Sequence, residues 1–241
     1  MSSVSHHQLP LLTFEVCVIE PKGYGIKING ALKKTPHQNP LIFPTKQLAI
    51  LYQEEFEAYQ GKFPKDVLLI QQLIYTALDL IAVNRDEYVE DLVNYASTDL
   101  LLYQAHYPQD LVLRQKDCWD LYLEGAGKFL SMTFMPTFDF QTKLVDRSKL
   151  LSYLETLDDF ALSGFYTAVE LTHSFILGLA LSERMASVSS VCEAALLHET
   201  YQQEKWGISQ EALQMKERLN QELSRVDSFL SALGKGQYHE G

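Results

Sequence analysis

Two acidic residues are the strongest candidates for chemistry in this chain. Asp99 lies between Tyr95 and Tyr103, and Glu199 follows an apolar stripe within 191–196. If both segments are helical, spacings of three and four residues place each carboxylate on an apolar face. Burial and mutual proximity push the proton affinities of two acids apart, as acid–base catalysis requires. A hydrolase or lyase that uses Asp99 and Glu199 is therefore one hypothesis for the function.

The same two acids also fit a purely structural role. An unpaired charge is costly to bury, so Asp99 requires an arginine, a set of backbone N–H groups or a donor from a binding partner. Among the arginines, Arg114 is the nearest candidate in the sequence. Glu199 would then make a second structural ion pair or a contact at a helix end. Sequence spacing does not determine whether Asp99 and Glu199 approach each other.

Motifs typical of established catalytic sites are missing. The sequence has no GxxxxGK[ST] or GxSxG motif and no close Cys–His pair. His198-Glu199 begins like the helix of a zinc metalloprotease, but Gln202 occupies the position of the required second histidine. His173 lies in an apolar run, and we expect it to be a hydrogen-bonded core residue. The sequence thus predicts neither a metal site nor a catalytic site and favours a protein that is not an enzyme.

The glycines near the N-terminus do not form a nucleotide-binding pattern. Gly23 and Gly25 precede Ile26-Lys27-Ile28, which continues a strand, whereas a phosphate-binding loop opens into a helix. The chain also has no basic cluster beside its glycines. We therefore expect no ATP binding and no cofactor.

The composition indicates a globular and strongly acidic protein. The 241 residues are 46% hydrophobic and 21% charged, which suits one large domain or a small domain beside a larger one. A formal net charge of -11 argues against nucleic acid and anionic lipid as partners, because both select basic surfaces. A basic or apolar protein partner is easier to accommodate. Three separated cysteines without CxxC spacing indicate small core residues in a reducing compartment: Cys17, Cys118 and Cys192.

No segment predicts export or membrane insertion. Residues 1–10 lack the basic and apolar regions of a signal peptide and the arginines of an organelle transit peptide. The run 160–181 approaches membrane length but contains Glu170 and His173 near its centre, which favours a buried central helix. We expect a bacterial cytoplasmic protein, or a mitochondrial matrix protein if the chain is a trimmed mature form.

Short strands are expected near the N-terminus. Apolar and β-branched residues form four runs, at 14–19, 24–28, 31–34 and 41–43. Asn29-Gly30 lies between two of these runs, and it predicts a tight hairpin because both residues tolerate a positive φ. Pro44-Thr45 then ends the strands and caps a helix.

Helical periodicity dominates the rest of the chain. The expected helices are 46–60, 66–83, 86–105, 116–130, 148–154, 158–182, 189–206 and 209–233. The last one has a narrow apolar seam, so it should pack on the other helices. With 61–64 as the linker, the fold class is α+β: a small N-terminal β-containing domain over 1–62, followed by a larger multihelical bundle domain over 63–241.

Blocks in a fixed order between residues 25 and 207 resemble a known family. The most specific blocks are Thr98-Asp99-Leu100-Leu101, Arg114-Gln115 and Trp206-Gly207. The others include Asn29-Gly30, Lys34-Thr35-Pro36, Asn39-Pro40-Leu41, Pro44-Thr45, Thr76-Ala77-Leu78-Asp79 and Tyr201-Gln202. Together they resemble the assembly chaperones of F-type ATP synthase that bind the isolated α subunit. The chain departs from the family pattern at three positions that concern partner contacts more than the fold: Phe56, Leu80 and Gln104.

The resemblance implies a chaperone that performs no catalysis. A free α subunit exposes the apolar surface that later meets the β subunit, and a surface of that kind promotes aggregation. The chaperone would cover this surface until β displaces it, which needs no ATP if the α–β contact is the tighter one. The resemblance also implies a small N-terminal β-containing domain and a helical C-terminal domain, in agreement with the periodicity.

The resemblance further implies roles for individual residues. Glu199 matches an acidic position that is functionally important in the family, and Tyr201 and Trp206 follow in the same region. These three residues are expected to support partner binding. Three other polar residues are expected to organise the structure: Asp79, Asp99 and Arg114.

The last predicted helix supports a third hypothesis, a helical scaffold that binds a different, basic partner through 209–233. Deleting this helix would abolish binding in that case. The chaperone hypothesis instead allows the helix a mainly structural role.

Overall fold

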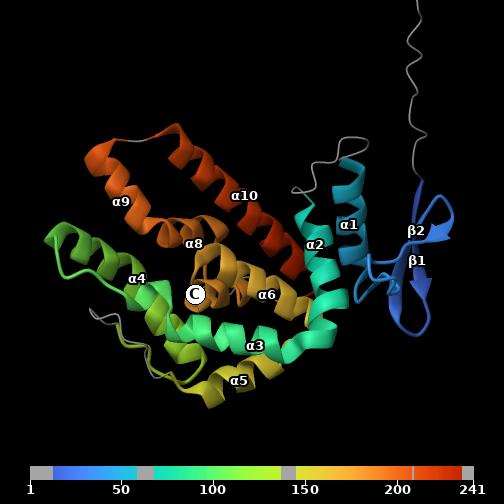
Figure 1. Ribbon diagram of the computed structural model, residues 1–241, viewed down its shortest axis with the longest axis horizontal. Helices are drawn as coiled ribbons and strands as arrows, with labels where there is room; N and C mark the ends of the chain where they lie inside the picture. Colours follow the sequence, from blue (N-terminus) through green and yellow to red (C-terminus); the bar gives the residue numbers. More distant parts are fainter. Residues whose placement is uncertain (1–12, 59–67, 137–144, 208, 235–241) are drawn as a thin grey trace, which may run out of the picture.

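The computed structural model describes residues 13–58, 68–136, 145–207 and 209–234. Within these ranges a small antiparallel sheet is followed by a bundle of helices, and the sheet lies at one end of the long axis (Figure 1). The predicted α+β fold class is confirmed. The predicted boundary after residue 62 and the linker 61–64 lie outside the described residues, so the division into two domains remains a prediction.

In the described part of the chain the sheet comprises β1 (Phe14–Ile19), β2 (Gly23–Ile28), β3 (Ala31–Leu32) and β4 (Ile42–Phe43). Strand β2 is central, since it pairs with each of the other three. Asn29 and Gly30 join β2 to β3 with φ angles of 51° and 79°, which confirms the predicted hairpin. Gly23 and Gly25 lie within β2, and a Cβ added at Gly23 would be 2.4 Å from the carbonyl oxygen of Phe43. Close strand packing therefore explains Gly23.

The helices after the sheet are α1 (Lys46–Ala58), α2 (Leu69–Tyr75), the π-helix η1 (Thr76–Ile81), α3 (Ala82–Ser97), the 3-10 helix η2 (Leu100–Leu102), α4 (Gln109–Phe129), α5 (Arg147–Glu155), α6 (Asp159–Thr172), α7 (Phe175–Ser182), α8 (Val188–Ala195), α9 (Leu197–Trp206) and α10 (Gln210–Ala232). Thr45 caps α1 as predicted, because its hydroxyl oxygen accepts a hydrogen bond from the Leu48 backbone N–H at 3.1 Å. Most predicted helices are present, but several have different ends.

Two predicted helices meet without a gap. Helices α2, η1 and α3 follow one another without a break in the chain, so the predicted helix end at Asn84 is wrong. Asn84 has a non-helical backbone, with φ of -122° and ψ of 35°, and it bends the helix instead of ending it. The helix predicted over 86–105 is also wrong in extent, since α3 ends at Ser97 and Asp99 leaves the helical conformation.

Two other predicted helices are each divided. The prediction over 158–182 breaks at His173, whose φ is 53°, and Ser174 caps the new helix α7. His173 is exposed, so its predicted place in the core is wrong. The prediction over 189–206 breaks at Leu196, which separates α8 from α9. Periodicity alone does not reveal such breaks, because the spacing of apolar residues continues across them.

Helix α6 lies at the centre of the bundle, with other helices around it, and it packs against α7 (Figure 1). Every residue of α7 is buried. A Cβ added at Gly164 of α6 would be 2.7 Å from the Leu230 side chain, so α6 and α10 pack closely. The apolar run predicted to be central is therefore buried, as two helices. None of the described helices is both long and apolar enough to cross a membrane.

Side chains of α1 and of its N-cap residue connect the sheet region to the bundle. The hydroxyl group of Thr45 donates to the backbone carbonyl of Ala232, at 2.5 Å, near the end of α10. The carboxylate of Glu55 accepts from the backbone N–H groups of Ile70 and Gln71 at the start of α2, at 3.1 and 2.9 Å. The helix dipole also stabilises a negative charge at this position, near the N-terminus of α2.

Helix α10 packs along only part of its length. Leu219, Leu223 and Leu230 are buried against the bundle, which confirms the predicted packing for this part. Leu213 and Met215, nearer its start, are exposed, so the predicted apolar seam does not continue there. Deleting α10 would therefore remove core residues as well as an exposed surface.

Candidate functional site

Asp99 is completely buried between η2 and α7. Its carboxylate accepts hydrogen bonds from the backbone N–H groups of Leu101 and Ile176, both at 2.9 Å. The Ser174 hydroxyl donates to the same carboxylate, with oxygen distances of 2.8 and 3.0 Å. Burial raises the pKa of Asp99 to about 6, even though these hydrogen bonds oppose the shift. Of the partners expected for a buried acid, backbone N–H groups are the ones present.

Arg114, the candidate arginine partner of Asp99, pairs with a different acid. Arg114 lies on α4 and forms a bidentate ion pair with Glu204 of α9, at 2.9 and 2.8 Å. Asp99 obtains its donors from the N-terminus of α7, so it needs no second buried charge. Arg114 connects two helices of the bundle, but it does so from a partly exposed face.

Glu199 is exposed, so its predicted position on an inward-facing stripe is wrong. The break at Leu196 changes the direction of the chain, and the spacing before it does not continue into α9. Glu199 instead lies in the first turn of α9, where the helix dipole stabilises a negative charge. Asp99, in contrast, has no exposed surface to receive a substrate. This arrangement gives no support to the hydrolase or lyase hypothesis.

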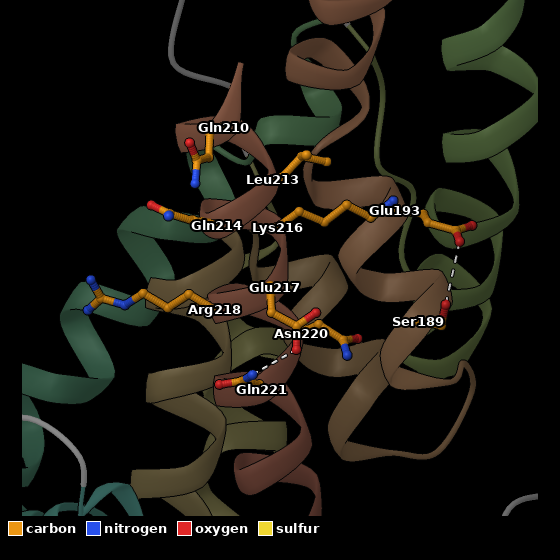
Figure 2. A pocket seen from close by; sticks show the side chains of 10 residues that line it. All are labelled: Ser189, Glu193, Gln210, Leu213, Gln214, Lys216, Glu217, Arg218, Asn220 and Gln221. Carbon is orange, nitrogen blue, oxygen red and sulfur yellow. Dashed lines mark hydrogen bonds between the residues drawn. The ribbon is translucent and has the colours of Figure 1, made fainter. Parts of the chain in front are cut away.

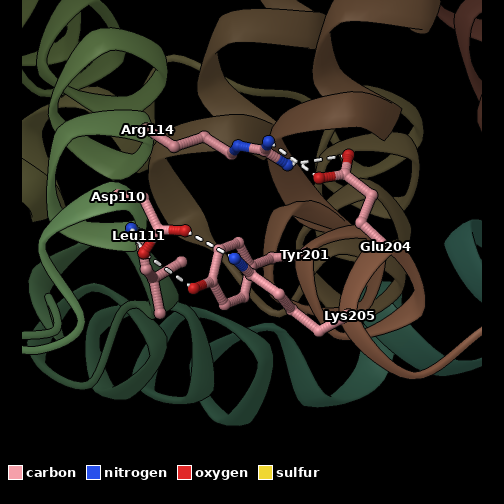
Figure 3. A network of polar contacts seen from close by, with 6 residues as sticks. All are labelled: Asp110, Leu111, Arg114, Tyr201, Glu204 and Lys205. Carbon is pink, nitrogen blue, oxygen red and sulfur yellow. Dashed lines mark hydrogen bonds and ion pairs between the residues drawn. The ribbon is translucent and has the colours of Figure 1, made fainter.

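The N-terminus of α4 and the end of α9 meet in a network of polar contacts (Figure 3). Asp110 accepts hydrogen bonds from the Tyr201 hydroxyl and from the Lys205 ammonium group, both at 2.8 Å. These two donors lower the pKa of Asp110 to about 2. The Lys205 nitrogen also lies 5.2 Å from the centre of the Tyr201 ring, within the range of a cation–π contact. Three side chains thus fix the end of α9 to the start of α4.

Arg114 extends this network along α4. Its guanidinium carbon lies 5.6 Å from the Tyr201 ring centre while its nitrogens bind Glu204 (Figure 3). Tyr201 is therefore buried between two cations. Asp110, Glu204 and Lys205 are not among the site residues predicted from the sequence. The spacing of Glu204 and Lys205, three and four residues after Tyr201, was the available signal, because such residues share one helix face.

The opposite side of α9 is open. Trp206 is 89% exposed, and Glu199 is exposed in the first turn of the same helix. Tyr201 is buried and directed toward α4, as the labelled side chains show (Figure 3). Helix α9 therefore has one face fixed by polar contacts and one free face. We call the free face, with Glu199 and Trp206, the α9 surface.

His198 is held by neighbouring side chains. Its ring packs edge-on against Trp119, with ring centres 5.2 Å apart, and contacts the side-chain amide of Gln115. Gln115 is itself buried and accepts from the Ala105 backbone N–H at 2.7 Å. Burial lowers the pKa of His198. Among the described residues, no three His, Cys, Asp or Glu side chains converge as metal ligands would.

Asp79 joins the sheet region to η1. Its buried carboxylate accepts from the Thr35 hydroxyl at 2.6 Å, from the Asn39 side-chain amide at 2.7 Å and from the His37 backbone N–H at 3.3 Å. Burial raises the pKa of Asp79, but these hydrogen bonds outweigh it and the net pKa is lowered. The geometry agrees with a structural role for this residue.

A hollow of about 730 Å³ lies between α8 and α10 (Figure 2). Leu213 is the one apolar side chain among the ten described residues that line it. Two pairs of these side chains bond to each other, Ser189 with Glu193 and Gln221 with Glu217 (Figure 2). The hollow is therefore an open polar depression, whereas small-molecule sites are mostly apolar and concave.

Comparisons with known proteins agree with this fold over almost the whole chain. Residues 13–126 match the model of the ATP12 family, described as ATP12 chaperone protein. The crystal structure of Atu1473 from Agrobacterium tumefaciens, a candidate chaperone, is 30% identical with a TM-score of 0.84, covering 91% of this chain and 84% of that one. Atp12 from Paracoccus denitrificans is 25% identical with a TM-score of 0.82, covering 92% of this chain and 96% of that one. A point mutant of Paracoccus denitrificans Atp12 is similar to the same degree, with 25% identity, a TM-score of 0.82 and coverage of 92% and 95%.

Proposed function

Because this chain belongs to the ATP12 chaperone family, we propose that it is a chaperone of ATP synthase assembly that binds the free α subunit. In this proposal the chaperone covers the apolar surface of α that later contacts β. The β subunit displaces it by forming the tighter contact, so the chaperone needs no ATP and carries out no catalysis. It acts where ATP synthase is assembled, in the bacterial cytoplasm or the mitochondrial matrix.

The observation that carries this proposal is the exposure of Trp206 on a helix that is otherwise fixed. Tryptophan is enriched among the residues that dominate binding energy in protein interfaces, because it buries a large apolar area on contact. Trp206 is 89% exposed, although the preceding residue, Lys205, is bound to Asp110. A rigid helix that presents a free aromatic side chain loses little conformational entropy on binding.

The charge of the chain supports the same proposal. A formal net charge of -11 suits a client that has basic residues around its apolar surface. Glu199 lies on the α9 surface with Trp206 and could form an ion pair with such a residue. Glu199 and Trp206 are thus our proposed partner-binding residues, while Tyr201 would act indirectly by fixing the position of α9.

Co-expression with the α subunit from the same organism tests this proposal. We expect soluble α and a complex that purifies with the chaperone, whereas α expressed alone should aggregate. Adding β should then release the chaperone and leave an α–β complex. If the folded chaperone neither binds α nor keeps it soluble, the proposal is wrong.

Reversing a charge on the α9 surface tests the role of Glu199. Glu199→Lys should reduce the recovery of the complex about tenfold, because it places like charges against a basic client. Glu20→Lys makes the same charge change at an exposed site between β1 and β2 and should leave recovery unchanged. Equal recovery with both variants would remove Glu199 from the proposed site.

A further inference from the structure

A second surface lies between α4 and the segment that joins α7 to α8. It is a groove of about 670 Å³ whose described lining is largely apolar. Leu121 of α4 and Met185 line the groove, and they are 73% and 41% exposed, respectively. Other apolar lining residues are Cys118, Tyr122, Ala180 and Ala186. The apolar character distinguishes this groove from the polar hollow between α8 and α10.

Gly125 lines this groove and is not explained by the fold. It lies inside α4, where glycine destabilises a helix relative to alanine. A Cβ added at Gly125 would have no atom within 4 Å, whereas a Cβ added at Gly127 would be 2.7 Å from the carbonyl oxygen of Met132. Close packing therefore requires glycine at 127 but not at 125. The absence of a side chain at Gly125 leaves one wall of the groove open.

The groove is bordered by negative charge. Asp117 of α4 and Glu193 of α8 line it, and no lysine or arginine does so within the described ranges. Glu193 also borders the hollow between α8 and α10, which Lys216 and Arg218 line as well (Figure 2). An apolar groove with two acids at its border favours an occupant that combines an apolar side chain with basic residues.

We propose that this groove receives an apolar side chain from a basic segment of the client α subunit. The inference rests on the proposed chaperone function and identifies a second contact of the same client, beside the α9 surface. Methionine adapts its shape to different apolar groups, so Met185 suits one side of such a site. The space beside Gly125 accommodates the incoming side chain, and Asp117 and Glu193 pair with the flanking cations.

Filling the groove tests the proposal without altering the core. Gly125→Phe places a ring in open space, because a Cβ at this position meets no other atom. Val83→Phe is the matched control: Val83 is 74% exposed on α3 and lies outside the groove. In co-expression with α, Gly125→Phe should reduce the recovered complex about tenfold, while Val83→Phe should match the wild type. Circular dichroism and thermal melting should show that both variants are folded.

Cys118 gives an independent measurement in the unmodified protein. This half-buried free thiol lines the groove, and Cys17 in β1 is a half-buried free thiol distant in the fold. Alkylation at alkaline pH followed by mass spectrometry should show Cys118 labelled in the free chaperone and protected in the complex with α. Labelling of Cys17 should not change.

The outcomes separate the groove from the proposed function. If wild-type chaperone captures α but Gly125→Phe does so equally well and Cys118 stays reactive, the groove proposal is wrong and the chaperone function stands. If wild-type chaperone captures no α, both are wrong. If Cys118 becomes protected in the chaperone alone as its concentration rises, the occupant is a second copy of this chain and the groove proposal is overturned.

Discussion

The carboxylate of Asp99 accepts a hydrogen bond from the backbone N–H of Ile176, 77 residues later in the chain, at 2.9 Å. This contact caps α7 at the point where the chain turns between α6 and α7. The same side chain caps η2 by accepting from the Leu101 backbone N–H. One buried acid therefore stabilises two helix starts that belong to different parts of the sequence.

Replacing Asp99 by asparagine should change how stability depends on pH. Burial raises the pKa of Asp99 from 3.8 to about 6, so the native state holds this proton more tightly than the unfolded chain. The resulting stabilisation is fully present below the unfolded pKa and is lost as pH rises through the folded pKa. The stability of the wild type relative to Asp99→Asn should therefore fall by about 2 kcal/mol between about pH 4 and about pH 7. Urea unfolding of both proteins measures this difference, and a pH-independent difference would contradict the assignment.

Removing the carboxylate of Asp79 should weaken the connection between the sheet region and η1. Asp79→Ala leaves the Thr35 hydroxyl without its acceptor and leaves the Asn39 amide with only the Leu78 carbonyl, at 3.4 Å. The expected loss is about 2–4 kcal/mol in the free energy of unfolding. Asp79→Asn retains one acceptor oxygen and should lose less. Chemical denaturation of the two variants gives the comparison, and equal losses would mean that the charge, not the oxygen, matters.

The two glycines near the end of α4 should respond to alanine in opposite directions. Gly125→Ala should stabilise the protein by about 0.5–1 kcal/mol, because it favours the helix and meets no other atom. Gly127→Ala should destabilise it by about 1–3 kcal/mol, because the new Cβ would be 2.7 Å from the Met132 carbonyl oxygen. Thermal melting of both variants distinguishes these effects. Stabilisation at both positions would show that the backbone near Met132 can move.

Loss of the Tyr201 hydroxyl should loosen α9 more than it destabilises the whole protein. Tyr201→Phe removes the hydrogen bond to Asp110 but keeps the ring between Arg114 and Lys205. Polar contacts to half-exposed groups such as Asp110 and Lys205 contribute little to global stability, but they can control local opening. Amide hydrogen exchange should therefore become faster in α9 while the melting temperature changes little. Unchanged exchange in α9 would show that the ion pair between Arg114 and Glu204 is sufficient.

Trp206 should matter for binding but not for folding. Because it is 89% exposed, Trp206→Ala should change the free energy of unfolding by less than about 0.5 kcal/mol. The same variant should reduce recovery of the α complex by about tenfold or more, as expected for a central interface tryptophan. Val83→Ala, at a similarly exposed residue on α3, controls for the loss of an apolar surface side chain. A loss of stability in Trp206→Ala would assign this residue to the fold.

The features that the sequence determined by itself are those set by neighbouring residues. The Asn29-Gly30 hairpin and the Thr45 cap follow from backbone preferences within a few positions, and both are present. The helical content of most of the chain follows from the periodicity of apolar residues. The family resemblance likewise rests on short blocks of neighbouring residues in a fixed order. The buried run around α6 and α7 also followed from composition, although its division at His173 did not.

Only the tertiary structure decided the roles of the individual acids. Asp99 receives its donors from Ser174 and Ile176, and no local pattern connects residues so far apart. Glu199 is exposed because the chain breaks at Leu196, although the spacing of apolar residues suggested a buried acid. A buried charge is satisfied by whichever donors the folded chain brings to it, and those donors are fixed only when the distant helices pack together.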